Sequence, residues 1–589
     1  MTETRNCQNC KQDFTIEPED FLFYEKIKVP PPTWCPTCRM QRRLVWRNER
    51  NLYKRKCDAP GHTETIISMY SEDAAVPVYD QKYWHGDGWD SGEYARTYDF
   101  SRSFFEQWKE LLYSVPTPAL INLQDVASDY CNFTYQSKNC YLNFASDINE
   151  DTEYLYHSIE NRNCADMLGS RKNENCVELA DCEQCYESEH LVLCQSCIQS
   201  KFCYDCRNCQ DCVGCIGLRN VKYSILNERY TPEEYQKKLK DLNLSTRVGR
   251  QKFQEEFNKL LASYPRKFSN SRRAVNSTGD YLNDVNNCVS CFDIEGPAED
   301  MRYVAYGLVG MRDIQDAYAI GVNIEHCYDI MDVGSNVHNV NFSANVWDSY
   351  DCTYCYFANN SSNCFGCVGI KNKQYCIFNK QYTKEEYEIL VPKIIEHMNK
   401  MPFVDSKGNS YVYGEYFPME FSFFPYNESI AQEYFTLSTE EAKRLGYVWR
   451  DLHDKSYIAT KKISDLPETI AEMSETILNE TIACEHAGNC QHQCTKAFRV
   501  ISPELQLYKK LGIPIPILCV NCRHYERLAK RNPLKLWHRA CMCGKIEHGH
   551  EGSLPESGGG GCPNEFETSY APERPEIIYC EKCYQQEVM

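Results

Sequence analysis

Short segments that alternate apolar and polar residues recur through the middle of the chain. The stretches YVAYG, DAYAIG, HCYDIMDVGS and VNFSAN have this pattern, and Asn, Asp, Gly or Ser follows in each unit. Alternation followed by turn-forming residues predicts a strand and a turn, repeated many times. The cysteines share the rhythm, with steps of nine residues in one set and twelve in another: Cys176, Cys185, Cys194, Cys203 and Cys212, then Cys352, Cys364 and Cys376.

Such a fixed repeat predicts a parallel β-solenoid with inward ladders of Cys, Val, Ile and aromatic residues. Inside a narrow coil, cysteine packs as a small apolar side chain, although the dense stretch 182–215 could also recruit metal. The repeat region is itself duplicated, because the segment from Asn220 to Tyr235 matches that from Asn372 to Tyr387. Each copy contains a capping box that predicts a helix closing a solenoid lobe: Thr231 with Glu234, and Thr383 with Glu386.

The two ends of the chain are copies of one module. The N-terminal copy has Cys7-x-x-Cys10 and Cys35-x-x-Cys38, and the C-terminal copy has Cys494 and Cys519-x-x-Cys522. Phe, Tyr, Pro, Arg, Leu and Asn positions between and after the knuckles match at one fixed offset. The fold class we expect is mainly β: a two-lobed, cysteine-rich parallel β-solenoid flanked by zinc-ribbon or treble-clef-like α+β modules.

The predicted domains follow from these boundaries. They are an N-terminal zinc ribbon with a basic helix (1–56), a degenerate second half-module with a helix (57–118), a first repeat lobe (119–230), a helical connector (231–277), a second repeat lobe (278–382), a capping helix with an aromatic extended segment and a further helix (383–480), and a C-terminal zinc module (481–589).

Two Cys-x-x-Cys knuckles can bind one Zn²⁺ tetrahedrally through four thiolates. We therefore predict a site at Cys7, Cys10, Cys35 and Cys38. In the C-terminal copy an insertion obscures the first ligand. Our choice is Cys490 with Cys494, Cys519 and Cys522, and Cys484 and His492 are the alternatives.

A second half-module follows each ribbon. At the C-terminus it predicts a further zinc site, with Cys543, His548 and His550 as alternative ligands to the simplest set of Cys541, Cys562, Cys580 and Cys583. At the N-terminus Cys57 remains, but Asp80 and Tyr83 replace the last two cysteines. His62 and Asp80 could complete a weaker site, and an empty fold stabilised by its core is the interpretation we prefer.

Basic segments follow both knuckles. Residues 39–56 carry eight Lys or Arg and one Glu, and four arginines recur there at helical spacing. A helix of this kind beside Trp46 and Trp537 could contact phosphates and stack on bases. The alternative is that the arginines offset the formal 2− charge of a Cys₄–Zn²⁺ centre or pair with the acidic remainder of the chain. The predicted nucleic-acid contacts are Arg42, Arg43, Arg47, Arg50, Arg527, Lys530 and Arg531.

Composition narrows the class of protein. Among 589 residues there are 36 cysteines, the formal net charge is −19, and no run of about 18 apolar residues occurs. The polar N-terminus lacks a signal-peptide pattern, so we expect a cytoplasmic protein without membrane association. In a reducing compartment, cysteine pairs bind metal more often than they form disulfides.

Two long segments resemble a bacterial family with terminal zinc-ribbon modules and a cysteine-rich repeat core. They are FTIEPEDFLFYEKIKVPPPTWCPTCRMQRRLVWRNER and RNPLKLWHRACMC, the latter continuing to FETSYAPERPEIIYCEKCY. The ribbon is also similar to small "probable zinc-ribbon domain" proteins. Members of the bacterial family sometimes carry the CoA-transferase label CaiB/BaiF, a chemistry for which this sequence contains no motif.

These features predict a zinc-binding, non-enzymatic protein that contacts nucleic acid or a ribonucleoprotein through its terminal modules. One alternative is a protein-interaction scaffold that uses the solenoid faces. Another is a thiol redox or metal-storage protein, which would require an exposed cysteine of low pKa or more metal than the ribbons hold. The sequence shows no Ser/His/Asp arrangement, phosphate loop or paired-carboxylate motif.

Overall fold

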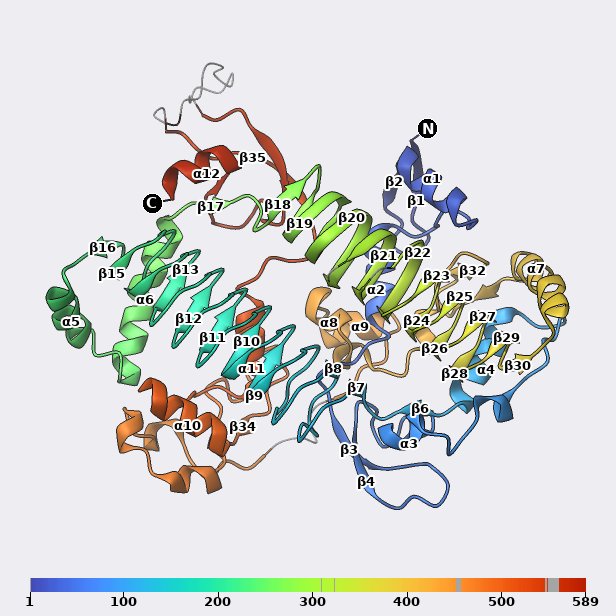
Figure 1. Ribbon diagram of the computed structural model, residues 1–589, viewed down its shortest axis with the longest axis horizontal. Coiled ribbons are helices and arrows are strands. Elements are labelled where there is room, and N and C mark those ends of the chain that lie inside the picture. The colour runs from blue at the N-terminus through green and yellow to red at the C-terminus, as the bar shows by residue number, and fades with distance from the viewer. Residues whose placement is uncertain are drawn as a thin grey trace. The chain divides into compact units, whose positions relative to one another are not determined.

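The computed structural model describes residues 2–308, 310–322, 324–451, 457–545, 548 and 561–588 (Figure 1). The chain divides into two compact units. The first unit comprises Met1–Leu120, Ser269–Arg450 and Leu534–Leu536, and the second comprises Ile121–Phe268, Asp451–Pro533 and Trp537–Met589. The N-terminal module therefore belongs with the later repeat region, and the C-terminal module belongs with the earlier one.

The second unit contains the first array of parallel strands. Its strands are β9 (Glu150–Tyr156), β10 (Arg162–Leu168), β11 (Val177–Ala180), β12 (Glu189–Val192), β13 (Lys201–Tyr204), β14 (Gln210–Val213) and β15 (Lys222–Ile225), paired in chain order. Leu155, Met167, Leu179 and Leu191 lie in register, so each strand pairs with the strand one twelve-residue coil later. The short strand β16 (Glu228–Arg229) pairs antiparallel to β15 and ends the array.

Within each coil the chain has a period of three. Cys203, Cys206 and Cys209 are at most 1% exposed, and the residue before each has positive φ: Phe202 (52°), Asp205 (45°) and Asn208 (51°). A left-handed residue at every third position turns the chain and directs the next side chain inward. The expected alternation of period two is therefore wrong for this array, and the steps of nine and twelve residues are both multiples of three.

The interior of the first array changes from amides to thiols along its length. The backbone N–H of Asn173 donates to Oδ1 of Asn161 (3.0 Å), and that of Cys185 donates to Oδ1 of Asn173 (2.8 Å). Farther along, the Cys206 thiol donates to the carbonyl of Cys215 (3.4 Å). The prediction that the repeat cysteines are buried is confirmed, and these thiols also satisfy backbone carbonyls.

The first unit contains the second array. It begins with β18 (Arg272–Val275), β19 (Gly279–Val289), β20 (Cys291–Leu308), β21 (Met311–Gly321) and β22 (Cys327–Gly334). Its later strands are β23 (His338–Asn341), β24 (Ala344–Trp347), β25 (Tyr350–Thr353), β26 (Tyr356–Asn359), β27 (Ser362–Phe365), β28 (Val368–Lys371), β29 (Gln374–Ile377) and β30 (Lys380–Gln381). Ile314 pairs with Cys327, a thirteen-residue step, whereas Cys352 pairs with Cys364, a twelve-residue step.

Helices follow both arrays as predicted. The helices α5 (Pro232–Asp241) and α7 (Lys384–Lys400) start at the capping boxes of Thr231 and Thr383. The helix α6 (Arg247–Ser263) completes the expected helical connector, and α9 (Thr439–Arg444) starts at Ser438. The aromatic segment that we expected to be extended within 383–480 covers residues 411–435, and it contains the short helices η2 (Met419–Phe421), η3 (Tyr426–Glu428) and α8 (Ala431–Tyr434). None of the helices in the described parts of the chain is long and apolar enough to span a membrane.

Candidate metal centres and the arginine ladders

The N-terminal cysteines converge as predicted. Cys7 and Cys10 lie in the turn between β1 (Glu3–Asn6) and β2 (Asp13–Ile16), and α2 (Pro36–Leu44) begins between Cys35 and Cys38. The four sulfurs lie within 4.8 Å of one another, and the Cys10 and Cys35 sulfurs are 3.8 Å apart. Zn–S bonds of about 2.3 Å in a tetrahedron place two sulfurs about 3.8 Å apart. The Cys7 sulfur also accepts the backbone N–H of Cys35 (3.2 Å).

In the C-terminal copy Cys484, one of our alternatives, converges with the other three cysteines in the position for which we chose Cys490. The sulfurs of Cys484, Cys494, Cys519 and Cys522 form a group that could hold a metal ion. The reason is the hairpin of β33 (Ile482–Ala483) and β34 (Ala497–Phe498), which places Cys484 where Cys7 stands in the N-terminal copy. Its sulfur accepts the backbone N–H of Cys519 (3.3 Å), as the Cys7 sulfur accepts that of Cys35.

The four cysteines predicted for the second C-terminal site converge. Buried Cys541, Cys562, Cys580 and Cys583 form a group of metal-ligand geometry, and the Cys562 and Cys580 sulfurs are 3.8 Å apart. The group lies at the end of β35 (Trp537–Ala540), beside β36 (Glu565–Thr568) and the start of α12 (Glu581–Glu587). Cys543 and His548 form a further group with Cys583. The alternative ligand His550 lies outside the described residues.

The N-terminal counterpart keeps the backbone geometry with different side chains. The Cys57 sulfur accepts the N–H of Asp80 (3.1 Å), just as the Cys541 sulfur accepts that of Cys580 (3.2 Å). The Asp80 carboxylate caps α3 (Gln81–His85) by accepting the N–H of Tyr83 (3.1 Å). The His62 and Tyr83 rings pack edge to face with centroids 4.4 Å apart. A helix cap and an aromatic pair therefore stand where the C-terminal copy has two thiols.

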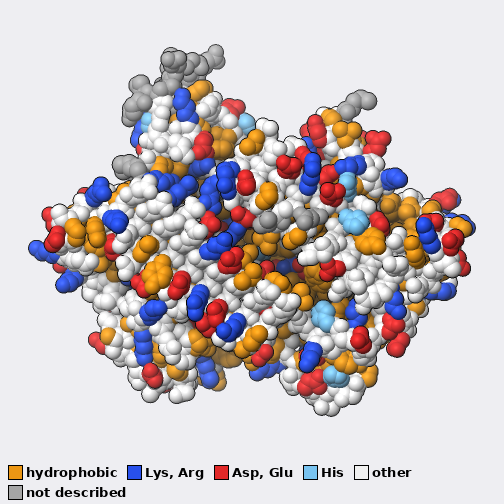
Figure 2. All heavy atoms as spheres, in the orientation of Figure 1, with side chains coloured by type: hydrophobic (Ala, Val, Ile, Leu, Met, Phe, Trp, Pro, Cys, Tyr) orange, Lys and Arg blue, Asp and Glu red, His pale blue; other side chains and the backbone are white. Residues whose placement is uncertain are grey.

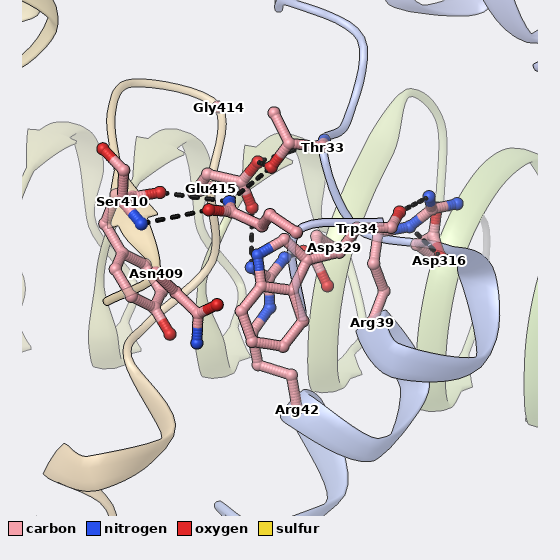
Figure 3. Close-up of polar contacts among 12 residues, drawn as sticks. Thr33, Trp34, Arg39, Arg42, Asp316, Asp329, Asn409, Ser410, Gly414 and Glu415 are labelled. Atoms are coloured by element: carbon pink, nitrogen blue, oxygen red, sulfur yellow. Dashed lines mark hydrogen bonds and ion pairs between the residues drawn. The ribbon is translucent and has the colours of Figure 1, made fainter. Parts of the chain in front are cut away.

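The arginines after the first ribbon point into the second array. The guanidinium of Arg39 forms two hydrogen bonds with the carboxylate of Asp316 (2.9 and 2.8 Å) (Figure 3). The guanidinium of Arg43 bonds Asp329 (2.6 Å). Arg42 bonds both Asp329 (2.7 Å) and Glu415 (2.6 Å). All three arginines are at most 1% exposed. Figure 1 shows α2 lying against β21 and β22, the strands around these aspartates.

The same contacts recur in the second unit. There α11 (Val520–Leu528) lies against β10, and Arg523 and Arg527 both bond the carboxylate of Asp166. Arg531 bonds Asp181 (2.9 Å). In both units a tyrosine of the array also donates a hydrogen bond to an acidic residue of the terminal module. Tyr303 donates to Asp20 (3.3 Å) in the first unit, and Tyr154 donates to Glu504 (3.1 Å) in the second. Both units therefore contain an arginine ladder: Arg39, Arg43 and Arg47 in the first, and Arg523, Arg527 and Arg531 in the second.

Helix and strand spacing explain how the ladders fit. Arginines four residues apart on a helix lie about 6 Å apart along its axis, and neighbouring coils lie about 4.8 Å apart. In the first unit Arg39 and Arg43 therefore meet carboxylates on successive coils, whereas in the second unit Arg523 and Arg527 share Asp166. Asp316 and Asp329, one thirteen-residue coil apart, have φ of 53° and 50°. Asp tolerates the left-handed conformation better than most residues, which suits it to this position.

Burial and charge act in opposite directions in these pairs. Burial alone would lower the pKa of Arg39, but the carboxylate of Asp316 raises it well above its ordinary value. Burial raises the pKa of Asp316, although the guanidinium groups of Arg39 and Arg43 oppose that shift. Each group depends on its partner, because a buried charge without a counter-ion is costly.

These positions correct the prediction of phosphate contacts. Arg42, Arg43, Arg47, Arg527 and Arg531 are buried and paired with carboxylates, so phosphates cannot reach them in this arrangement. Arg50 is half-buried and bonds Glu433 (3.1 Å), whereas Lys530 is exposed. Arg47 and Arg50 lie beyond the end of α2 rather than on one long helix. Trp46 is 1% exposed and packs on Trp108 and Phe417, so it is not a base-stacking surface.

Figure 2 shows Lys and Arg interspersed with Asp and Glu on the face in view.

No protein-family model matches the chain, and no curated protein matches it either. The resemblance drawn from its motifs therefore stays a prediction.

Proposed function

We propose that the chain is a zinc-stabilised, non-enzymatic scaffold in which each terminal module holds one β-solenoid lobe. The lobes would then present their long faces to a protein partner. The observation that carries this proposal is the pair of buried arginine ladders. Guanidinium groups that hold a solenoid lobe cannot also bind phosphates, which favours the scaffold over the nucleic-acid hypothesis.

Zinc fits the donor sets. Four thiolates at tetrahedral spacing suit Zn²⁺, and such closed Cys₄ sites are structural rather than catalytic. Each second knuckle starts the helix that carries the first two arginines of the ladder, because Cys38 precedes Arg39 and Cys522 precedes Arg523. A bound ion would thereby fix the helix start and align the guanidinium groups with the carboxylates of the lobe.

The exposed coil corners support a protein partner. Polar side chains form ladders there, for example Asn139 with Asp151 (3.0 Å) and Asn339 with Asp351 (3.0 Å). Large side chains such as Tyr135, Tyr186 and Tyr350 are exposed along the same arrays. Aromatic residues are enriched at protein interfaces. The carboxylates of these ladders would repel a polyanion.

Metal analysis of the full chain, followed by binding to generic RNA and DNA at two salt concentrations, tests the proposal. We expect bound zinc and no salt-dependent nucleic-acid binding. Binding that weakens with salt and is lost in Lys530→Glu would instead restore the nucleic-acid hypothesis. A protein that purifies without metal and keeps its ribbons protease-resistant in chelator would contradict the zinc-stabilised scaffold.

A further inference from the structure

The loop between Cys484 and Cys494 carries metal donors of its own. It has nine residues, where the N-terminal knuckle has two. His486, Cys490 and His492 from this loop form a group with Cys522, and all four ligand atoms lie within 4.8 Å of one another. The Cys490 and Cys522 sulfurs are 3.7 Å apart, close to the tetrahedral spacing of about 3.8 Å expected around zinc.

The two imidazoles are oriented for binding. Nδ1 of His486 and Nδ1 of His492 are buried without a hydrogen-bond partner among the described residues. Buried polar atoms are nearly always satisfied, so two orphaned nitrogens in one cluster point to a missing ligand. Nε2 of His486 lies 3.6 Å from the Glu526 carboxylate, and the His492 ring stacks on Tyr525. A carboxylate on the far nitrogen is the usual support of a metal-binding histidine.

Cys522 belongs to both groups. Its sulfur is 3.9 Å from that of Cys484, in the Cys₄ set, and 3.7 Å from that of Cys490, in the loop set. We propose that the C-terminal ribbon holds two zinc-class ions bridged by the Cys522 sulfur. Cys484, Cys494 and Cys519 complete the first ion, and His486, Cys490 and His492 complete the second. This inference rests on the proposed zinc binding at the Cys₄ set.

Charge balance favours the second ion. One Zn²⁺ with four thiolates has a formal charge of 2−, whereas two Zn²⁺ with five thiolates and two neutral imidazoles have 1−. The second ion thus offsets both the Cys490 thiolate and part of the first centre. The N-terminal copy provides the comparison within the same chain, because its two-residue knuckle loop contains only Gln8 and Asn9.

The test is metal analysis and ¹¹³Cd NMR of the full chain loaded with cadmium. A shared thiolate should split two cadmium resonances by coupling between them. In His486→Ala/His492→Ala we expect the loss of one ion per chain, and the remaining ribbon resonance should lose its splitting. The matched control is His538→Ala, an exposed histidine 63% accessible that pairs with Glu565 and Glu567, and it should lose nothing.

The bridged pair of ions and the zinc binding at the Cys₄ sets can fail separately. Unchanged metal content in the double-histidine variant, or an unsplit ribbon resonance in the native chain, would overturn the bridged pair and leave the Cys₄ sites intact. Cys7→Ser and Cys519→Ser should each lose metal. If neither did, the proposed zinc binding itself would fail.

Discussion

Arg39 and Asp316 form a buried, two-point ion pair in which the arginine directly follows Cys38, a candidate metal ligand. Its guanidinium bonds both carboxylate oxygens, and the two side chains are 1% and 0% exposed. In the other unit, Arg523 follows Cys522 and forms a buried ion pair with Asp166 through one guanidinium nitrogen, while Arg527 bonds the other carboxylate oxygen. The candidate metal centre and the array are thereby connected through one residue in each unit.

Breaking this pair should cost far more than breaking a surface pair. Asp316→Ala leaves the guanidinium of Arg39 buried without its main counter-ion, so we expect a loss of about 3–5 kcal/mol in the free energy of unfolding. Urea denaturation of the full chain measures this loss. In the same unit, Arg102→Ala removes an exposed pair with Glu110 and should cost less than about 1 kcal/mol. Equal losses in the two variants would contradict a structural role for the buried ladder.

Metal-ligand variants should loosen the array that each module contacts. In Cys38→Ser we expect faster hydrogen exchange in β21 and β22, with β10 and β11 unchanged, because α2 packs on the second array. Cys522→Ser should give the opposite pattern, because α11 packs on β10. Hydrogen exchange resolved by mass spectrometry distinguishes the two. Changes restricted to the ribbon residues in both variants would show that the modules do not hold the arrays.

The buried carboxyl of Glu153 should make the free energy of unfolding fall as pH rises. Burial raises the pKa of this carboxyl from 4.5 to about 9, and the nearby carboxylate of Glu504 adds to the shift. Because the folded-state pKa is raised, the contribution of the neutral Glu153 carboxyl to the free energy of unfolding is fully present below pH 4.5. It is lost as the pH rises through about 9. Glu153→Gln should therefore raise the free energy of unfolding at pH 8 by at least about 1 kcal/mol and change it little at pH 4.5.

Denaturation of Glu153→Gln at both pH values checks this sign. Glu150→Gln on the same strand is the control, because Glu150 is exposed and pairs with Lys138. The control should not show the gain at pH 8. A gain of equal size at the two pH values would mean that Glu153 is not protonated in the folded chain.

The left-handed positions should reject β-branched residues. Asn208 has φ of 51°, and its amide donates to Asn220 one coil later (3.2 Å). Asn208→Val should destabilise the first array by about 1–2 kcal/mol, because a β-branched side chain is strained at positive φ. Asn208→Gly should cost less, since glycine adopts this conformation freely. Thermal denaturation that ranked the two variants in reverse would exclude strain as the cause.

The sequence by itself determined the parts of this protein that local chemistry controls. Knuckle spacing identified Cys7, Cys10, Cys35 and Cys38, because two short loops can present four thiolates to one ion whatever surrounds them. The capping boxes at Thr231 and Thr383 located two helices, because a cap forms from neighbouring residues. The repeat spacing predicted parallel strands. The spacing of Cys203, Cys206 and Cys209 already carries the period of three, but an alternation of period two does not describe the left-handed residue before each cysteine.

Only the tertiary structure decided what the arginines do and which cysteine completes the C-terminal ribbon. Arg43 and Asp329 are 286 residues apart, and nothing local distinguishes a guanidinium that meets a phosphate from one that meets a buried carboxylate. Cys484 and Cys490 have equal chemistry, and the choice between them depends on a hairpin that ends at residue 498. Long-range packing settled both questions, because burial and strand pairing are properties of the whole fold.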